Sequence, residues 1–338
     1  MLRNSAFRAN PDGDVPCEMR LTWLANQPSS LLKPIGLNHA GIEKIIEWQG
    51  FCSSSFSASS LNRHRRAVRV TGSGLGCPTW PECTPGSYTP VPGQAEGALH
   101  AWIEFGNRLL TFVLLICALA ALAISVKLST KSIKKIRIRL LAFLQLLGIL
   151  GQGVLGGITV LTDLHPIPVA GHFLLSIFLI AGAISLRFEM VGVDKQEATG
   201  LIRPLLPIFI WLTLFVLIAG TIVTGSGPHA GDEQAKRFGF DPRVVSWLHA
   251  DLVIALIVLS AMLLLITRGS ELNLLHRRIK LFLILSLLQG VVGYVQYFTG
   301  LPVILVALHL LGATLVWSTA WSLIKVANSG FKLKGLLQ

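Results

Sequence analysis

The stretch Gln152-Gly153-Val154-Leu155-Gly156 is followed by His172, twenty positions after its first residue, at the start of an apolar segment. A second copy, Gln289-Gly290-Val291-Val292-Gly293, is followed by His309 at the same spacing. Each copy therefore delivers one imidazole to the beginning of an apolar helix. Polar ring nitrogens in hydrocarbon are costly and usually serve a function. A structural histidine that bonds a helix neighbour is the plainer interpretation, but a matched pair favours the functional one.

The composition is that of a membrane protein. Hydrophobic residues make up 52% of the chain and charged residues only 14%, which lies outside the usual range for soluble domains. The formal net charge of +12 arises from short basic runs between apolar segments. The positive-inside rule explains such runs, so the charge does not indicate binding to nucleic acid.

Seven apolar segments have the length of a membrane-spanning helix. We expect these helices to cover residues 102–126, 140–161, 168–186, 204–223, 245–267, 281–299 and 303–324. A second repeat accompanies the first, because Thr71-Gly72-Ser73-Gly74 recurs as Thr224-Gly225-Ser226-Gly227. The sequence thus predicts an all-α integral membrane protein of two pseudo-symmetric helix bundles, with halves at 67–190 and 191–338.

Residues 1–66 differ from the rest of the chain. They contain no apolar run long enough to span a bilayer or to form the core of a signal peptide. A serine-rich stretch at 53–60 and a basic run at 63–66 indicate a non-spanning, disordered region. The apolar pattern then begins at Ala67 and Val68 as abruptly as it would after a shift of reading frame.

The basic residues predict the orientation of the helices. Segments 127–139, 187–203, 268–280 and 325–338 hold sixteen Lys or Arg, whereas the opposite side holds five. This difference places the four segments in the cytoplasm and the Cys77–Cys83 loop outside the cell membrane. That compartment allows a disulfide to persist, and the spacing of the five cysteines permits one local disulfide and no zinc cluster.

Four helices begin on the outer side and carry candidate site residues at one depth. Three present His172, His249 and His309, and the fourth presents Glu104 and Asn107 on one face. Imidazoles on facing helices of a bundle can hold heme, which makes His249 and His309 a candidate pair of axial ligands. Zinc is the rival interpretation, but it would require three or four close ligands.

Two further features have alternative interpretations. The carboxylate of Glu104 either pairs with Arg108 at i+4 on the helix surface or transfers protons at the depth of the histidines. The motif glycines are small residues at helical spacing, and they let neighbouring helices approach closely. The set comprises Gly153, Gly156, Gly157, Gly290 and Gly293.

Taken together, the region from Ala67 to the last helix resembles the heme A synthase family. The resemblance rests on Thr-Gly-Ser-Gly-Leu-Gly-Cys-Pro-Thr-Trp-Pro-x-Cys at 71–83, on Glu-Phe-x-x-Arg at 104–108, and on the three outward histidines. It implies two four-helix halves, a heme b cofactor and heme O as substrate, whose C8 methyl group is oxidised to a formyl group to give heme A. Heme O synthase and assembly factors of terminal oxidases are the implied partners.

The resemblance also implies roles for particular residues. His249 and His309 would be the axial ligands of the heme b iron, and His172 would bind the iron of the substrate heme. Glu104 would be the catalytic carboxylate. The remaining implied feature is a disulfide between Cys77 and Cys83.

The chain departs from the family pattern at two places. Asn107 stands where the family has a histidine ligand, and His100 cannot substitute for it because seven helical residues span about 10 Å. The family also has a spanning helix just before Ala67, and none is visible here. Two other functions stay open: a diheme b-type membrane cytochrome that passes electrons from quinol, and a transporter built from two repeats. A transporter would usually show helices broken at mid-membrane.

Overall fold

The computed structural model describes residues 75–93, 98–127, 133–192, 195–228 and 235–328. The prediction for residues 1–66 and the first copy of the Thr-Gly-Ser-Gly motif lie outside these ranges. The described chain is helical apart from two strands of two residues each. The elements, in order, are α4 (Ala98–Lys127), α5 (Ile133–Leu161), α6 (Pro166–Val191), β1 (Gln196–Glu197), α7 (Ile202–Ser226), α8 (Pro242–Ile266), α9 (Asn273–Phe298), α10 (Val303–Val326) and β2 (Ala327–Asn328).

All seven predicted spanning helices are confirmed, since seven helices within the described residues are long and apolar enough to cross a membrane. Several extend further than predicted, and α5 begins at Ile133 rather than 140 and α9 at Asn273 rather than 281. The added residues are rich in Lys and Arg, which a hydropathy criterion rejects. Lys and Arg are both good helix formers, so α5 and α9 continue beyond their apolar segments.

The ends of the helices fall at two levels. We call one level the disulfide end; it comprises the loop at 75–93 and the first turns of α4, α6, α8 and α10. The other level, the basic end, comprises the last turns of these four helices and the first turns of α5, α7 and α9. Local sequence sets two of the starts at the disulfide end. Pro166 and Pro242 occupy first-turn positions, and the preceding His165 and Asp241 accept hydrogen bonds from backbone N–H groups of the first turn.

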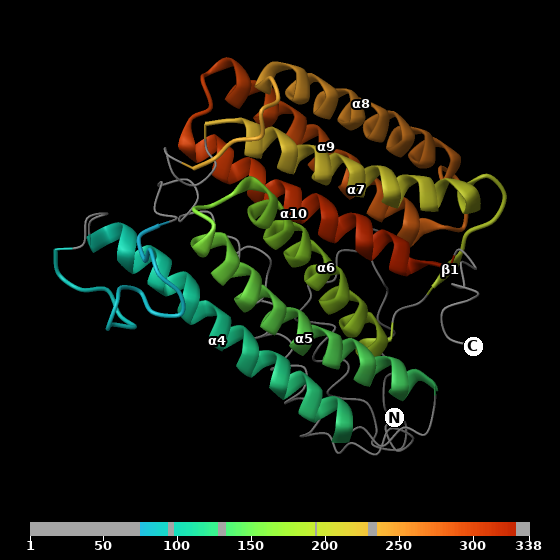
Figure 1. Cartoon of the computed structure of the whole chain (residues 1–338). Helices are drawn as coiled ribbons and strands as arrows, with labels where there is room; N and C mark the ends of the chain where they lie inside the picture. Colours follow the sequence, from blue (N-terminus) through green and yellow to red (C-terminus); the bar gives the residue numbers. More distant parts are fainter. Residues whose placement is uncertain (1–74, 94–97, 128–132, 193–194, 229–234, 329–338) are drawn as a thin grey trace, which may run out of the picture.

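The helices form two groups that lie side by side (Figure 1). One group is α4, α5 and α6, and the other is α7 to α10, which share the largest apolar core. Helix α6 packs against α7 and α10 at the boundary between the groups, which we call the seam. Two indoles cross it: Trp317 donates to the carbonyl oxygen of Ile177 and Trp321 to Oγ of Ser185, each at 2.8 Å.

A short parallel β-pair closes the seam at the basic end. Strand β1 follows α6 and pairs with β2, which follows α10, with Gln196 opposite Ala327. The side chain of Gln196 also accepts a hydrogen bond from the N–H of Leu275 at 2.8 Å and donates to the carbonyl oxygen of Glu271. The link between the halves is therefore tied to the start of α9 and the end of α10.

Candidate functional site

The three predicted histidines share one packing arrangement. Each ring lies against a glycine of the helix that precedes its own, with its Cε1 and Nδ1 edge facing that glycine. A Cβ added at the glycine would lie 3.4 Å from Cε1 for Gly156 and His172, 3.4 Å for Gly220 and His249, and 3.2 Å for Gly293 and His309. At two motif positions, Gly156 and Gly293, the missing side chain makes room for an imidazole ring, and the structure adds Gly220. Sequence reasoning missed Gly220 because it lies outside the repeated motif, four residues before the second Thr-Gly-Ser-Gly.

His249 on α8 and His309 on α10 face each other across the second bundle. Their ring centres are 6.5 Å apart and their planes meet at 72°. Nδ1 of each ring is buried. Imidazole nitrogens bind metal ions at about 2.0–2.1 Å, so two rings that share one metal ion have centres on the order of 6 Å apart. The separation of these two rings therefore fits a metal ion held between them.

In the first bundle, formed by α4, α5 and α6, the position of His172 is fixed through a hydrogen bond to its backbone. Gln152 on α5 donates its Nε2 to the carbonyl oxygen of His172 at 3.1 Å and to Oγ of Ser176 at 2.8 Å. This contact gives the spacing of twenty residues a structural reason, because Gln152 fixes the first turns of α6. The second copy differs. Ala313 stands at the position of Ser176, and the side chain of Gln289 instead occupies the space where a Cβ at Gly312 would lie.

One face of α5 brings three other parts of the first bundle together. Gly153 faces Thr111 of α4, Gly156 faces His172 of α6, and Gly157 faces the indole of Trp80 in the disulfide loop. A Cβ at position 157 would lie only 2.6 Å from that indole. Because glycines leave this face without side chains, α4, the imidazole of His172 and the disulfide loop all contact α5 near its end.

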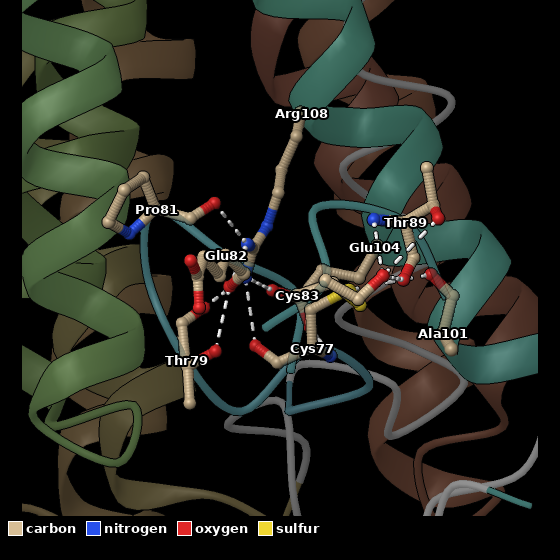
Figure 2. Close-up of a disulfide and its surroundings, with 10 residues drawn as sticks. Cys77, Thr79, Pro81, Glu82, Cys83, Thr89, Ala101, Glu104 and Arg108 are labelled. Atoms are coloured by element: carbon tan, nitrogen blue, oxygen red, sulfur yellow. Dashed lines mark hydrogen bonds and ion pairs between the residues drawn. A yellow bond between two sulfur atoms is a disulfide. The ribbon is translucent and has the colours of Figure 1, made fainter. Parts of the chain in front are cut away.

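Glu104 is buried at the start of α4, with 4% of its surface exposed. Its Oε1 accepts a hydrogen bond from Arg108 at 2.8 Å, and its Oε2 accepts one from the backbone N–H of Cys77 at 2.7 Å (Figure 2). The i+4 pairing with Arg108 is therefore present, but it is a buried contact rather than a surface one. The second bond ties the carboxylate directly to the disulfide loop.

Arg108 organises that loop. Besides the carboxylate, its guanidinium donates hydrogen bonds to four backbone carbonyl oxygens of the loop (Figure 2). The distances are 2.8 Å to Cys77, 2.9 Å to Thr79, 2.9 Å to Glu82 and 3.2 Å to Pro81. The predicted disulfide between Cys77 and Cys83 is present, and both residues are fully buried. A planar group with several fixed donors suits such convergent carbonyls.

Asn107 lies one turn from Glu104 on the same helix. Its Oδ1 is buried and has no hydrogen-bond partner among the described residues. An unsatisfied buried amide oxygen is costly in an apolar bundle, so this position suits a group that the protein alone does not provide. Within the described ranges, no three His, Cys, Asp or Glu side chains come together as a metal-binding group.

The fold and these contacts define a class: a multi-spanning helical membrane protein in which two groups of helices each place imidazole against a glycine-bearing helix face. The chain belongs to the family of cytochrome oxidase assembly proteins, since the COX15-CtaA family model matches residues 67–321. This match confirms the resemblance to the heme A synthase family, and it begins at Ala67, where the apolar pattern begins. A search of curated proteins and a search of solved structures found no match to the chain.

Proposed function

We propose that the protein is a heme A synthase, which oxidises the C8 methyl group of heme O to a formyl group and so makes heme A for cytochrome oxidase. Family membership supports a role in oxidase assembly. The observation that carries the proposal is the buried Glu104, held by Arg108 and Cys77 in the bundle that contains His172. In a cytochrome that oxidises quinol, the same carboxylate would serve only as a proton conduit.

His172 is the residue that would bind the iron of the substrate. The notch at Gly156 and the bond from Gln152 fix its position. Asn107 stands where the family pattern has a second histidine, so the substrate iron would have one imidazole ligand and an open face. An open face suits oxidation better than simple electron transfer.

Glu104 would accept protons as the methyl group is oxidised. Turning a methyl into a formyl group is a four-electron oxidation; with water as the source of the oxygen it releases four protons, which must leave the site, and four electrons, which must pass to an external acceptor. Each oxygen of Glu104 accepts one hydrogen bond from the protein and retains a further lone pair for water or substrate. Arg108 and the N–H of Cys77 keep the carboxylate in a fixed orientation, which is the requirement for general base catalysis.

His249 and His309 would hold heme b in the second bundle. Their separation fits a shared metal ion, and each ring is backed by a glycine. When bound, heme b would supply one-electron transfer. The distribution of basic residues supports an orientation with the disulfide end outside the cell and the basic end in the cytoplasm.

Extraction of pigments from the purified protein tests the proposal. The synthase should carry heme O or heme A in addition to heme b when it is produced in cells that make heme O. Heme b alone, under the same conditions, would instead support a cytochrome that passes electrons from quinol.

A further inference from the structure

At the basic end, the seam holds a group of cations that the proposed function does not use. We call it the seam cluster. It combines side chains from four helices and the link between the halves: Arg137 on α5, Arg187 on α6, Lys195 before β1, Arg278 on α9 and Lys325 on α10.

One buried carboxylate partly balances this charge. Glu189 has 8% of its surface exposed, and its Oε1 lies 3.3 Å from Nη1 of Arg137. Lys325 interacts electrostatically with the same carboxylate, and also with the like charges of Arg137 and Lys195. A single carboxylate therefore serves two cations, with a third beside them.

Arg278 adds a further positive charge at a partly buried position. Its Nη1 donates to Oγ of Ser322 at 3.1 Å, which is a neutral partner, and it interacts electrostatically with the like charge of Arg187. Among the described residues at this end, two other carboxylates, Glu197 and Glu271, belong to exposed residues. In the part of the chain that the structure describes, the cluster thus sets five cations against one buried carboxylate; Arg278 and Lys325 are partly buried, and the other three cations are exposed.

The backbone around the cluster is well fixed. The bond from Trp321 to Ser185 lies one turn before Lys325 and Glu189 on their helices. The β1 and β2 pair closes the seam just beyond the helix ends. Four of the five cations therefore sit on packed helices, and Lys195 lies directly before β1.

Like charges gathered around a single carboxylate repel one another, and a further anion among them reduces that repulsion. The cluster lies at the tips of spanning helices, the depth at which lipid phosphates occur, and basic pockets between helices bind anionic headgroups. We propose that the seam cluster binds the headgroup phosphate of an anionic phospholipid. The bound lipid would then link the two groups of helices at the basic end. This inference does not depend on the proposed heme chemistry.

The test compares two pairs of substitutions in the full-length protein. R278Q/K325Q removes two cluster charges, and R277Q/K280Q removes two exposed charges from the same end of α9. Each purified protein is titrated in detergent with phosphatidylglycerol, phosphatidylcholine and inorganic phosphate, and bound lipid is counted by native mass spectrometry. We expect the dissociation constant for phosphatidylglycerol to rise about tenfold or more in the cluster pair and far less in the control pair.

Three results would overturn the proposal. Equal weakening in both pairs would mean that net charge alone attracts the lipid. Equally tight binding of phosphatidylcholine would show no selection for an anionic headgroup, and inorganic phosphate that competes at the same concentration would mean a site for free anions. If the buried substitutions prevent folding, R187Q/K195Q removes two exposed charges of the cluster, and binding as tight as in the parent would equally exclude the site.

Discussion

Arg108 lies 2.8 Å from the carboxylate of Glu104 and, with the same guanidinium, donates hydrogen bonds to the backbone of the disulfide loop. The carboxylate in turn accepts the N–H of Cys77. Helix α4 and the loop are thus joined by a closed set of contacts among three residues. A change in any one of them should alter both the loop and the position of the carboxylate.

The first prediction concerns the shape of the Arg108 side chain. R108K keeps the charge but loses the planar donors that reach several carbonyls at once. We expect the free energy of unfolding to fall by at least about 2 kcal/mol, the scale of one or two lost charged hydrogen bonds, and the disulfide to become accessible to a mild reductant. Thermal unfolding and thiol labelling measure the two effects.

A matched control for R108K is R139K. Arg139 also donates its guanidinium to backbone carbonyl oxygens, those of Ser125 and Val126, but at the basic end. R139K should leave thiol labelling of the loop unchanged. If both variants expose the disulfide equally, Arg108 has no special part in holding the loop.

The second prediction concerns the glycine face of α5. In G157A the new Cβ would lie 2.6 Å from the indole of Trp80, so the loop must move, at a cost of about 1–3 kcal/mol. In G290A nothing lies within 4 Å of the new Cβ, and the gain in helix propensity should stabilise the protein by up to about 1 kcal/mol. Tryptophan fluorescence should change only in G157A, and the temperature of thermal unfolding should fall in G157A and rise in G290A; similar shifts in the two variants would contradict the predicted contact.

Much of the fold could be predicted from the sequence because apolar length and repeated motifs are local signals. The seven spans and the three equivalent histidines followed from such signals, whereas the disulfide was implied by the family resemblance. The part played by Arg108 could not, since its partners are backbone carbonyls of a loop whose path the residues alone do not reveal. Gly220 was missed because no repeated motif marks it. The cations of the seam cluster were visible only as a sign of orientation, because their convergence depends on how α6, α9 and α10 pack.

The third prediction tests the second bundle. If His249 and His309 both bind heme b, H249A and H309A should each abolish its low-spin absorption spectrum while the protein still inserts into the membrane. H276A is the control, because His276 also lies on a spanning helix but contacts Thr267 at the basic end. A parental spectrum in either site variant would refute that residue as a ligand.

The fourth prediction concerns Glu104. In E104Q the amide turns an N–H donor toward either Arg108 or the N–H of Cys77, and it can no longer take up a proton. Conversion of heme O should fall by roughly 10²–10⁴-fold, the range for loss of a positioned acid or base, while heme b stays bound and reducible because its proposed ligands lie in the other bundle. The yield of heme A and the reduced spectrum measure the two properties.

The control for E104Q is E82Q in the disulfide loop. The side-chain carboxylate of Glu82 accepts a hydrogen bond from the N–H of Gly86, and this contact is exposed to solvent. E82Q should therefore leave the yield of heme A unchanged. A yield in E104Q equal to that in E82Q would reduce Glu104 to a structural partner of Arg108.

The last prediction restores the ligand that the family pattern has at Asn107. In the proposed site His172 binds the substrate iron from one side and Asn107 lies toward the other, with a buried oxygen that no described residue satisfies. N107H would supply a second imidazole, so heme O bound to the variant should change to a low-spin spectrum. The same filled face should slow oxidation, because the open position is lost. N107D, which cannot supply an imidazole, serves as the control, and its spectrum should show no such change. A spectrum of N107H identical to that of the parent protein would mean that Asn107 and His172 do not flank the same iron.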